Sequence, residues 1–190
     1  MTAEFDGIIE TVVGALPRIE EGFAGGRAYA EMENPSGQEV LAADVRADEI
    51  LHDALTSLDC VGEYASEERE SVVDCGSGVS VAIDPLDGSS NLVTNNPVGV
   101  ILGVYDAPLP CPGTNLVGAA YAVFGPLTTV VVADGDDANV TEHVVEDGEV
   151  QNARELRLPE PTVYGFGGGV ENRTGGFAEF ADEIERELKL

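Results

Sequence analysis

The chain has 190 residues, of which 43% are apolar, so it can form a folded domain with a sizeable core. It carries 36 acidic and 9 basic residues, and its formal net charge is −27. A surface this negative repels nucleic acid, so no nucleic-acid partner is expected. Lys189 is the only lysine, and the acids are spread along the sequence. Such a composition is typical of halophilic proteins, whose high-salt surroundings screen self-repulsion.

No apolar stretch approaches the ~20 residues needed to cross a membrane, so no membrane partner is expected. The first residues, Met1–Asp6, contain neither a basic segment nor an apolar signal core, which favours a cytoplasmic protein. Cys60, Cys75 and Cys111 are far apart and lack Cys-x-x-Cys spacing. They are expected to be reduced thiols, neither a disulfide framework nor a zinc site.

Helical and β-rich patterns succeed each other along the chain. Residues 3–24 predict a helix with a break at Pro17, residues 34–37 a loop, and residues 41–58 a second helix. β-Rich runs then follow at residues 61–66, 79–83, 98–105, 116–124, 127–133, 140–145 and 162–166. The turn at Gly125-Pro126 is too short for a crossover helix, so an antiparallel hairpin is expected around it. A last helix carries the apolar positions Phe177, Phe180, Ile184 and Leu188. The order predicts an α+β fold with N-terminal helices packed on a largely antiparallel sheet.

The strongest functional signal is the segment Asp84-Pro-Leu-Asp87-Gly-Ser-Ser-Asn91 at the end of a β-rich run. Because the proline fixes one backbone angle, Asp84 and Asp87 can aim their carboxylates at a shared point, which the Leu86 carbonyl can also face. The next three residues offer backbone N–H groups that could cradle a phosphate: Gly88, Ser89 and Ser90. A polar turn with capping Asp and Ser is the alternative interpretation of this segment.

A second acidic motif, Ser66-Glu67-Glu68, stands at the end of a predicted strand. Adjacent carboxylates on an extended chain point in opposite directions, so one can bind metal while the other positions or deprotonates water. In a chain this acidic, a Glu-Glu pair gains meaning only from its place sixteen residues before Asp84.

Together these motifs resemble those of class I fructose-1,6-bisphosphatases, metal-dependent sugar phosphatases related to inositol monophosphatases. The resemblance extends to Asp44, at the start of the second predicted helix, and to residues 113–125. Its acidic, lysine-poor composition makes the chain similar to the haloarchaeal type. Ser89-Ser90 favours the fructose-bisphosphatase branch, because the wider superfamily usually carries Thr after this glycine.

The resemblance implies a layered sugar-phosphatase fold that hydrolyses the 1-phosphate of fructose 1,6-bisphosphate to fructose 6-phosphate and phosphate in gluconeogenesis. It also implies a homo-oligomer and two or more Mg²⁺ ions, with Mn²⁺ or Zn²⁺ as substitutes. The implied metal ligands are Glu67, Asp84, Leu86 and Asp87. The implied catalytic residues, which orient and activate the attacking water, are Asp44 and Glu68. The implied substrate-binding residues are Asp87, Gly88, Ser89 and Ser90.

The resemblance implies that residues 1–190 are the N-terminal portion of a sugar-phosphatase domain, truncated before its C-terminal α/β portion. In the family that portion supplies a last metal-binding Glu and the basic groups that hold the 6-phosphate. The segment Tyr164–Gly169 also departs from the family, because Gly167 stands where an Asn contacts substrate. Two further interpretations therefore stay open: a phosphatase for inositol phosphates or other sugar phosphates, and a catalytically inactive relative that binds metal or phosphate.

Overall fold

The structure is a computed structural model that describes residues 3–37, 39–135, 140–157, 160 and 173–187. The chain divides into two compact units, Met1–Leu156 and Arg157–Leu190. Within the second unit, the predicted terminal helix forms as α4 (Gly175–Glu187), in which Ala181 is fully buried. Arg173, which precedes this helix, pairs with Glu185 at 2.8 Å. No helix in the described ranges is long and apolar enough to span a membrane.

A sheet of eight strands forms the body of the first unit. The strands are β3 (Val61–Ser66), β4 (Val73–Asp74), β5 (Val79–Asp87), β6 (Val98–Tyr105), β7 (Leu116–Phe124), β8 (Thr128–Asp134), β9 (Val140–Glu146) and β10 (Glu149–Glu155). Their order in the sheet is β10-β9-β8-β7-β6-β5-β3-β4. β3 and β5 are parallel, and the other neighbours are antiparallel. The largely antiparallel sheet and the hairpin of β7 and β8 are therefore confirmed.

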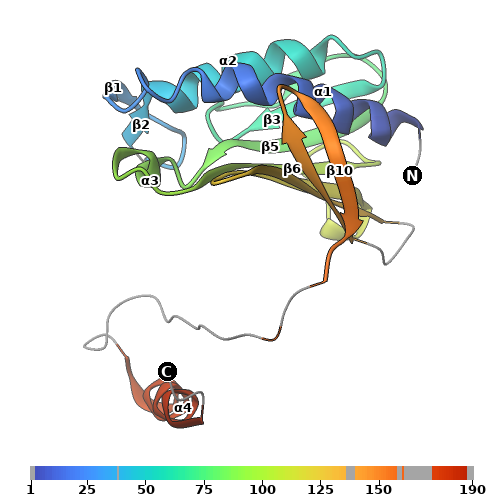
Figure 1. Ribbon diagram of the computed structural model, residues 1–190. Coiled ribbons are helices and arrows are strands. Elements are labelled where there is room, and N and C mark those ends of the chain that lie inside the picture. The colour runs from blue at the N-terminus through green and yellow to red at the C-terminus, as the bar shows by residue number, and fades with distance from the viewer. Residues whose placement is uncertain (1–2, 38, 136–139, 158–159, 161–172, 188–190) are drawn as a thin grey trace. The chain divides into compact units, whose positions relative to one another are not determined.

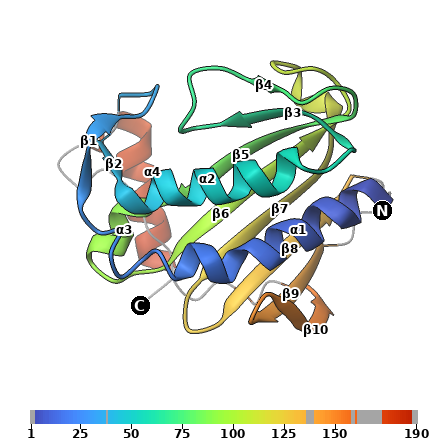
Figure 2. The same ribbon diagram turned by 90° about the horizontal axis from the view of Figure 1, so that it is seen from above.

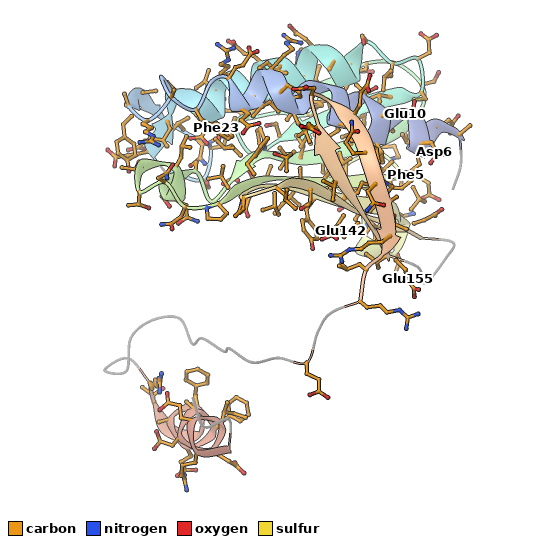
Figure 3. All side chains as sticks on the ribbon, in the orientation of Figure 1. Phe5, Asp6, Glu10, Phe23, Glu142 and Glu155 are labelled. Carbon is orange, nitrogen blue, oxygen red and sulfur yellow. The ribbon has the colours of Figure 1, made fainter. Side chains whose placement is uncertain are left out.

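Two long helices, α1 (Ala3–Glu20) and α2 (Ala42–Thr56), lie side by side on one face of this sheet (Figures 1 and 2). Phe5 and Phe23, labelled in Figure 3, connect the helical layer to the sheet. Phe5 occupies the space above Gly118, where any Cβ would collide with its ring. Phe23 meets Phe124 edge-on, with ring centroids 4.9 Å apart. Burial of such apolar side chains between the layers is the main stabilising contribution to the fold.

Three short elements gather beside the start of α2. β1 (Tyr29–Glu33) and β2 (Glu39–Leu41) form a separate two-stranded ribbon, and α2 begins directly after it. The helix α3 (Ser89–Val93) follows β5. Figure 2 shows the ribbon, α3 and the first turn of α2 together at one end of this unit. Both acidic motifs identified in the sequence reach this end.

Several elements differ from the sequence-based predictions. α1 continues through Pro17, where a break is predicted, and ends at Glu20. β5 extends past Asp84 to Asp87, so both aspartates of the first acidic motif lie within the strand instead of following it. Four strands and a helix, all short or exposed, have no counterpart among the predicted elements: β1, β2, β4, β10 and α3. The strand predicted at residues 162–166 and the glycine-rich segment at 164–169 lie outside the described residues.

Candidate active site

Asp84 and Asp87 reach the same pocket because the pairing of β5 with β6 is irregular. Asp84 lies opposite Ile101 and Asp87 opposite Gly99, so β5 advances three residues while β6 advances two. A bulge of this kind redirects side chains that strict alternation would send to opposite faces. The Asp84 carboxylate also accepts the N–H of Leu86 at 3.1 Å, which fixes its direction. The two carboxylates can therefore act at one place, as the motif predicts.

Gly88 turns the chain from β5 into α3. Its φ of +71° lies in the left-handed region, and a Cβ here would come within 3.1 Å of Asn91 Nδ2. The Asn91 N–H closes the turn by donating to the Gly88 carbonyl at 2.7 Å. Ser89 and Ser90 then occupy the first turn of α3 and line the pocket, where helical N–H groups lack intrahelical acceptors.

Glu67 and Glu68 stand in a turn, because β3 ends at Ser66. The Glu67 N–H donates to the Ile83 carbonyl at 3.1 Å, and the Glu68 N–H donates to Ser66 Oγ at 3.2 Å. The strand alternation predicted for this pair is wrong, since the extended backbone stops before it. Both carboxylates line one pocket instead of pointing to opposite sides.

Asp44 lies in the first turn of α2 and is 4% exposed. Its carboxylate accepts the N–H of Leu41 at 2.6 Å, as an acid near a helix start commonly does. Burial raises the pKa of Asp44, the Leu41 N–H and a Ser89 hydrogen bond oppose that rise, and the charge of Glu67 adds to it. The capping geometry therefore holds this carboxylate beside α3 and the Glu67 turn.

One pocket of about 570 Å³ unites these groups. It is lined by every residue predicted as catalytic, metal-binding or substrate-binding: Asp44, Glu67, Glu68, Asp84, Leu86, Asp87, Gly88, Ser89 and Ser90. The structure thus brings them all together, while their individual roles stay predictions. Sequence reasoning missed Asn34, which is 8% exposed, lines the same pocket and donates from Nδ2 to Glu67 Oε1 at 3.3 Å. Its only signal in the sequence is that of a turn-forming residue in a loop.

The carboxylates of the pocket repel one another. Burial, followed by the charges of Asp44 and Glu67, raises the pKa of Glu68 to about 7. Burial and the charge of Glu67 likewise raise the pKa of Asp84 to about 7. Every charged side chain that lines the pocket is an acid, so no lysine or arginine among the lining residues compensates this charge. The pocket therefore has a strong electrostatic preference for cations.

The donor set of the pocket fits a hard divalent cation. Carboxylates and a backbone carbonyl supply only oxygen ligands, the kind that Mg²⁺ and Ca²⁺ prefer. A bound cation would also relieve the repulsion that raises the pKa of Glu68 and Asp84. Within the described part of the chain, however, no three His, Cys, Asp or Glu side chains converge as a ready-formed metal site.

A second hollow, of about 470 Å³, continues from Asp87 and Asn91 over strands β6 to β8. Its lining includes Ile101 and Tyr121, which are exposed, whereas the neighbouring Leu102 is buried. Because side chains alternate along a strand, this hollow lies on the sheet face opposite the helices. Its walls are almost wholly apolar, unlike the carboxylate-lined walls of the first pocket.

Comparison with known proteins agrees with this geometry. The family described as fructose-1-6-bisphosphatase, N-terminal domain, matches residues 22–154. A class 1 fructose-1,6-bisphosphatase of Natronomonas pharaonis is 47% identical over the whole chain, which covers 68% of that relative. One from Halobacterium salinarum is 44% identical and is 67% covered. The chain thus spans about two thirds of the length of these relatives.

A solved structure shares the same fold. The fructose-1,6-bisphosphatase of Leishmania major in its holo form superimposes on the whole chain with a TM-score of 0.83, at 24% identity. The chain covers 66% of that structure. The family match, the two archaeal relatives and the fold lead to the same assignment. This chain belongs to the fructose-1,6-bisphosphatase family.

Proposed function

We propose that the protein hydrolyses the 1-phosphate of fructose 1,6-bisphosphate to fructose 6-phosphate and phosphate, with Mg²⁺ as its metal. The names of the most similar relatives support this substrate. The observation that carries the proposal is the single pocket in which both acidic motifs meet. Residues 1–190 would form the N-terminal portion of the phosphatase domain, in keeping with the family match over residues 22–154.

The metal ligands would be Glu67, Asp84, Asp87 and the Leu86 carbonyl. Their oxygens surround the pocket from β5 and from the turn after β3. When bound, two or more Mg²⁺ ions would neutralise the phosphoryl oxygens, which is the main requirement of this chemistry. Mn²⁺ or Zn²⁺ would be substitutes. The pairing irregularity of β5 is what lets Asp84 and Asp87 share this task.

Glu68 and Asp44 would orient and deprotonate the attacking water. Both line the pocket, and neither is needed for the metal set given above. A carboxylate whose pKa is about 7, as for Glu68, can accept a proton near neutral pH. Asp44 is held by its helix-capping bond to Leu41, so its free oxygen has a fixed direction. The pair would therefore act as general base and orienting group.

The 1-phosphate would lie against Gly88, Ser89 and Ser90. The left-handed backbone of Gly88 lets the chain turn so that the first residues of α3 border the pocket. N–H groups and serine hydroxyls suit phosphate oxygens, and they add no charge. Asp87, itself one of the proposed metal ligands, directly precedes this segment and could also reach the sugar.

We further propose that this enzyme works in gluconeogenesis, in the cytoplasm of a halophile, and as a homo-oligomer. The net charge of −27 supports the high-salt setting, as do the relatives in Halobacterium salinarum and Natronomonas pharaonis. Screening at molar salt would reduce the self-repulsion of so acidic a surface.

The test measures phosphate and fructose 6-phosphate release at molar KCl with Mg²⁺. The wild-type chain should be active, and Asp84→Asn should lose activity while keeping its melting temperature. Asp53→Asn is the matched control, because Asp53 is an exposed carboxylate on α2 outside the pocket. If the wild type binds Mg²⁺ in calorimetry but releases no phosphate, a metal-binding relative without catalysis replaces this proposal. Activity in Asp84→Asn would refute the site.

A further inference from the structure

Behind the pocket, three polar side chains form a connected group that we call the Asp48 clamp: Asp48, Tyr64 and Arg69. Asp48 lies on α2 and is 5% exposed. Its Oδ1 accepts the Tyr64 hydroxyl at 3.1 Å, and its Oδ2 pairs with Arg69 Nη2 at 2.7 Å. The Arg69 guanidinium also lies 5.8 Å from the centre of the Tyr64 ring. None of the three lines the pocket itself.

The clamp joins two elements that carry different parts of the candidate site. Asp48 is one helical turn after Asp44, so both lie on the same side of α2. Tyr64 and Arg69 stand on either side of Glu67 and Glu68 in the sequence. The Asp48 carboxylate therefore holds both ends of the segment that presents the two glutamates.

The turn between these ends is already closed by backbone bonds. The Arg69 N–H donates to the Ser66 carbonyl at 3.2 Å, and the Glu68 N–H to Ser66 Oγ at 3.2 Å. These bonds shape the turn, but they do not fix it to α2. Among the described residues, Asp48 on α2 accepts the Tyr64 hydroxyl of β3 and pairs with Arg69 of the turn, and the His52 ring on α2 contacts the Tyr64 ring.

We propose that the Asp48 clamp positions Glu67 and Glu68 relative to Asp44, and that Arg69 is its decisive member. This inference rests on the proposed function, since it concerns the alignment of the metal-binding and water-activating groups of that site. Asp48, Tyr64 and Arg69 are positioning residues, because they act on the reaction through the glutamates and touch no reacting atom.

Charge explains why the turn needs such a clamp. The carboxylates of Asp44, Glu67, Glu68 and Asp84 face one pocket, and their repulsion favours a movement of the turn away from α2. Asp48 adds a further negative charge nearby. Arg69 supplies a counter-charge to Asp48, in a chain with only nine basic residues. Its planar guanidinium can pair with Asp48 and stack on Tyr64 at once, which a lysine cannot do.

The test compares Arg69→Ala, Arg69→Lys and Tyr64→Phe with the wild type at molar KCl. In Arg69→Ala, kcat and the calorimetric affinity for Mg²⁺ should each fall about tenfold, as is usual when the support of a metal ligand is lost. KM for the sugar bisphosphate should change little, because the phosphate-binding segment lies on α3. Arg69→Lys should restore part of both losses, and Tyr64→Phe should cause smaller ones.

Hydrogen–deuterium exchange of the chelator-treated protein gives a readout that needs no activity. The amides of Glu67, Glu68 and Arg69 should exchange faster in Arg69→Ala, while those of α1 stay unchanged. Arg46→Ala is the matched control. Arg46 is a basic residue of α2, but its contact with Glu21 is exposed and 4.0 Å long. It should change neither exchange in the turn nor Mg²⁺ affinity.

Different outcomes separate the clamp from the proposed function. If the wild type proves inactive, exchange and Mg²⁺ affinity still test the clamp. Wild-type exchange in the turn and wild-type Mg²⁺ affinity in Arg69→Ala would overturn it. Equal losses in Arg69→Ala and Arg46→Ala would overturn it as well, because they would reflect general loss of a positive charge.

Discussion

Asp44 accepts the backbone N–H of Leu41 at 2.6 Å while it also lines the carboxylate pocket. One side chain thus caps α2 and serves the candidate site, and two substitutions should separate these roles. Asn keeps an oxygen for the cap but cannot act as a base, so Asp44→Asn should lower kcat about 100-fold or more. Its melting temperature should not fall, because a buried charge is removed.

Asp44→Ala should lose the cap as well as the base. Its free energy of unfolding should fall by about 1 kcal/mol, the size of a typical helix cap. Phosphate-release assays and thermal melts of the two variants check this pair of outcomes. Full activity in Asp44→Asn would exclude Asp44 from catalysis.

Gly88 offers a test of the phosphate-binding segment. Its φ is +71°, so Gly88→Ala should cost about 1 kcal/mol of stability. The added Cβ would also press on Asn91, shift the start of α3 and raise KM. Gly148→Ala is the control, since Gly148 has φ +79° in the turn between β9 and β10 and lies outside the pocket. It should lose stability with an unchanged KM; an equal rise of KM in both variants would contradict the assignment.

The raised pKa values of Glu68 and Asp84 predict how pH affects the metal-free protein. Both are about 7 in the folded state, against about 4 for ordinary carboxyls. Between about pH 4 and about pH 7 the folded state therefore binds more protons than the unfolded state. The stability that comes from this proton binding is lost as pH rises through about 7. Chelator-treated protein at constant KCl should melt at a higher temperature at pH 5.5 than at pH 8.

Glu68→Gln should reduce this pH dependence, because the amide does not titrate. Asp53→Asn should preserve it, since that substitution removes only an exposed carboxylate. Added Mg²⁺ should raise the melting temperature more at pH 8 than at pH 5.5, because protons compete with the cation for the same oxygens. If the melting temperatures of wild type and Glu68→Gln change with pH to the same extent, Glu68 is not in a charged cluster.

The net charge of −27 predicts a strong effect of salt. The Debye length is about 10 Å at 0.1 M salt and about 3 Å at 1 M, so neighbouring surface carboxylates are screened only at the higher value. The melting temperature should fall when KCl is lowered from molar concentrations to 0.1 M. Sucrose, which adds no ions, should not replace KCl. A melting temperature independent of KCl would refute the halophilic interpretation.

The parts of the fold with strong local patterns are predictable from the sequence. β7 alternates between buried and more exposed residues, β8 contains a run of three valines, and Gly125-Pro126 separates the two, so both the strands and their pairing follow from local rules. The helix α2 likewise follows from its apolar period. By contrast, every residue of β10 is exposed, so no burial pattern marks it, and β2 has only three residues.

In the site, the sequence identifies the groups that we propose to act chemically but misses those that we propose to support them. The acidic motifs stand out because Asp, Pro, Gly and Ser occur in an order with a chemical purpose. Asn34 and Asp48 have no such context: one is in a loop, and the other is one acid among 36. Their importance arises from contacts across the fold, with Glu67 for Asn34 and with Tyr64 and Arg69 for Asp48.

The parallel pairing of β3 with β5 places Ser66 beside Ile83. The residues that follow them, Glu67 just after β3 and Asp84 within β5, therefore lie next to each other at the same position along the two strands. Their separation is set by the hydrogen-bonded ladder, and the length of the connection from residue 70 to residue 78 has no part in it. Insertions in that connection outside β4 should be tolerated, whereas a slip of one residue in the ladder would send one carboxylate to the wrong face.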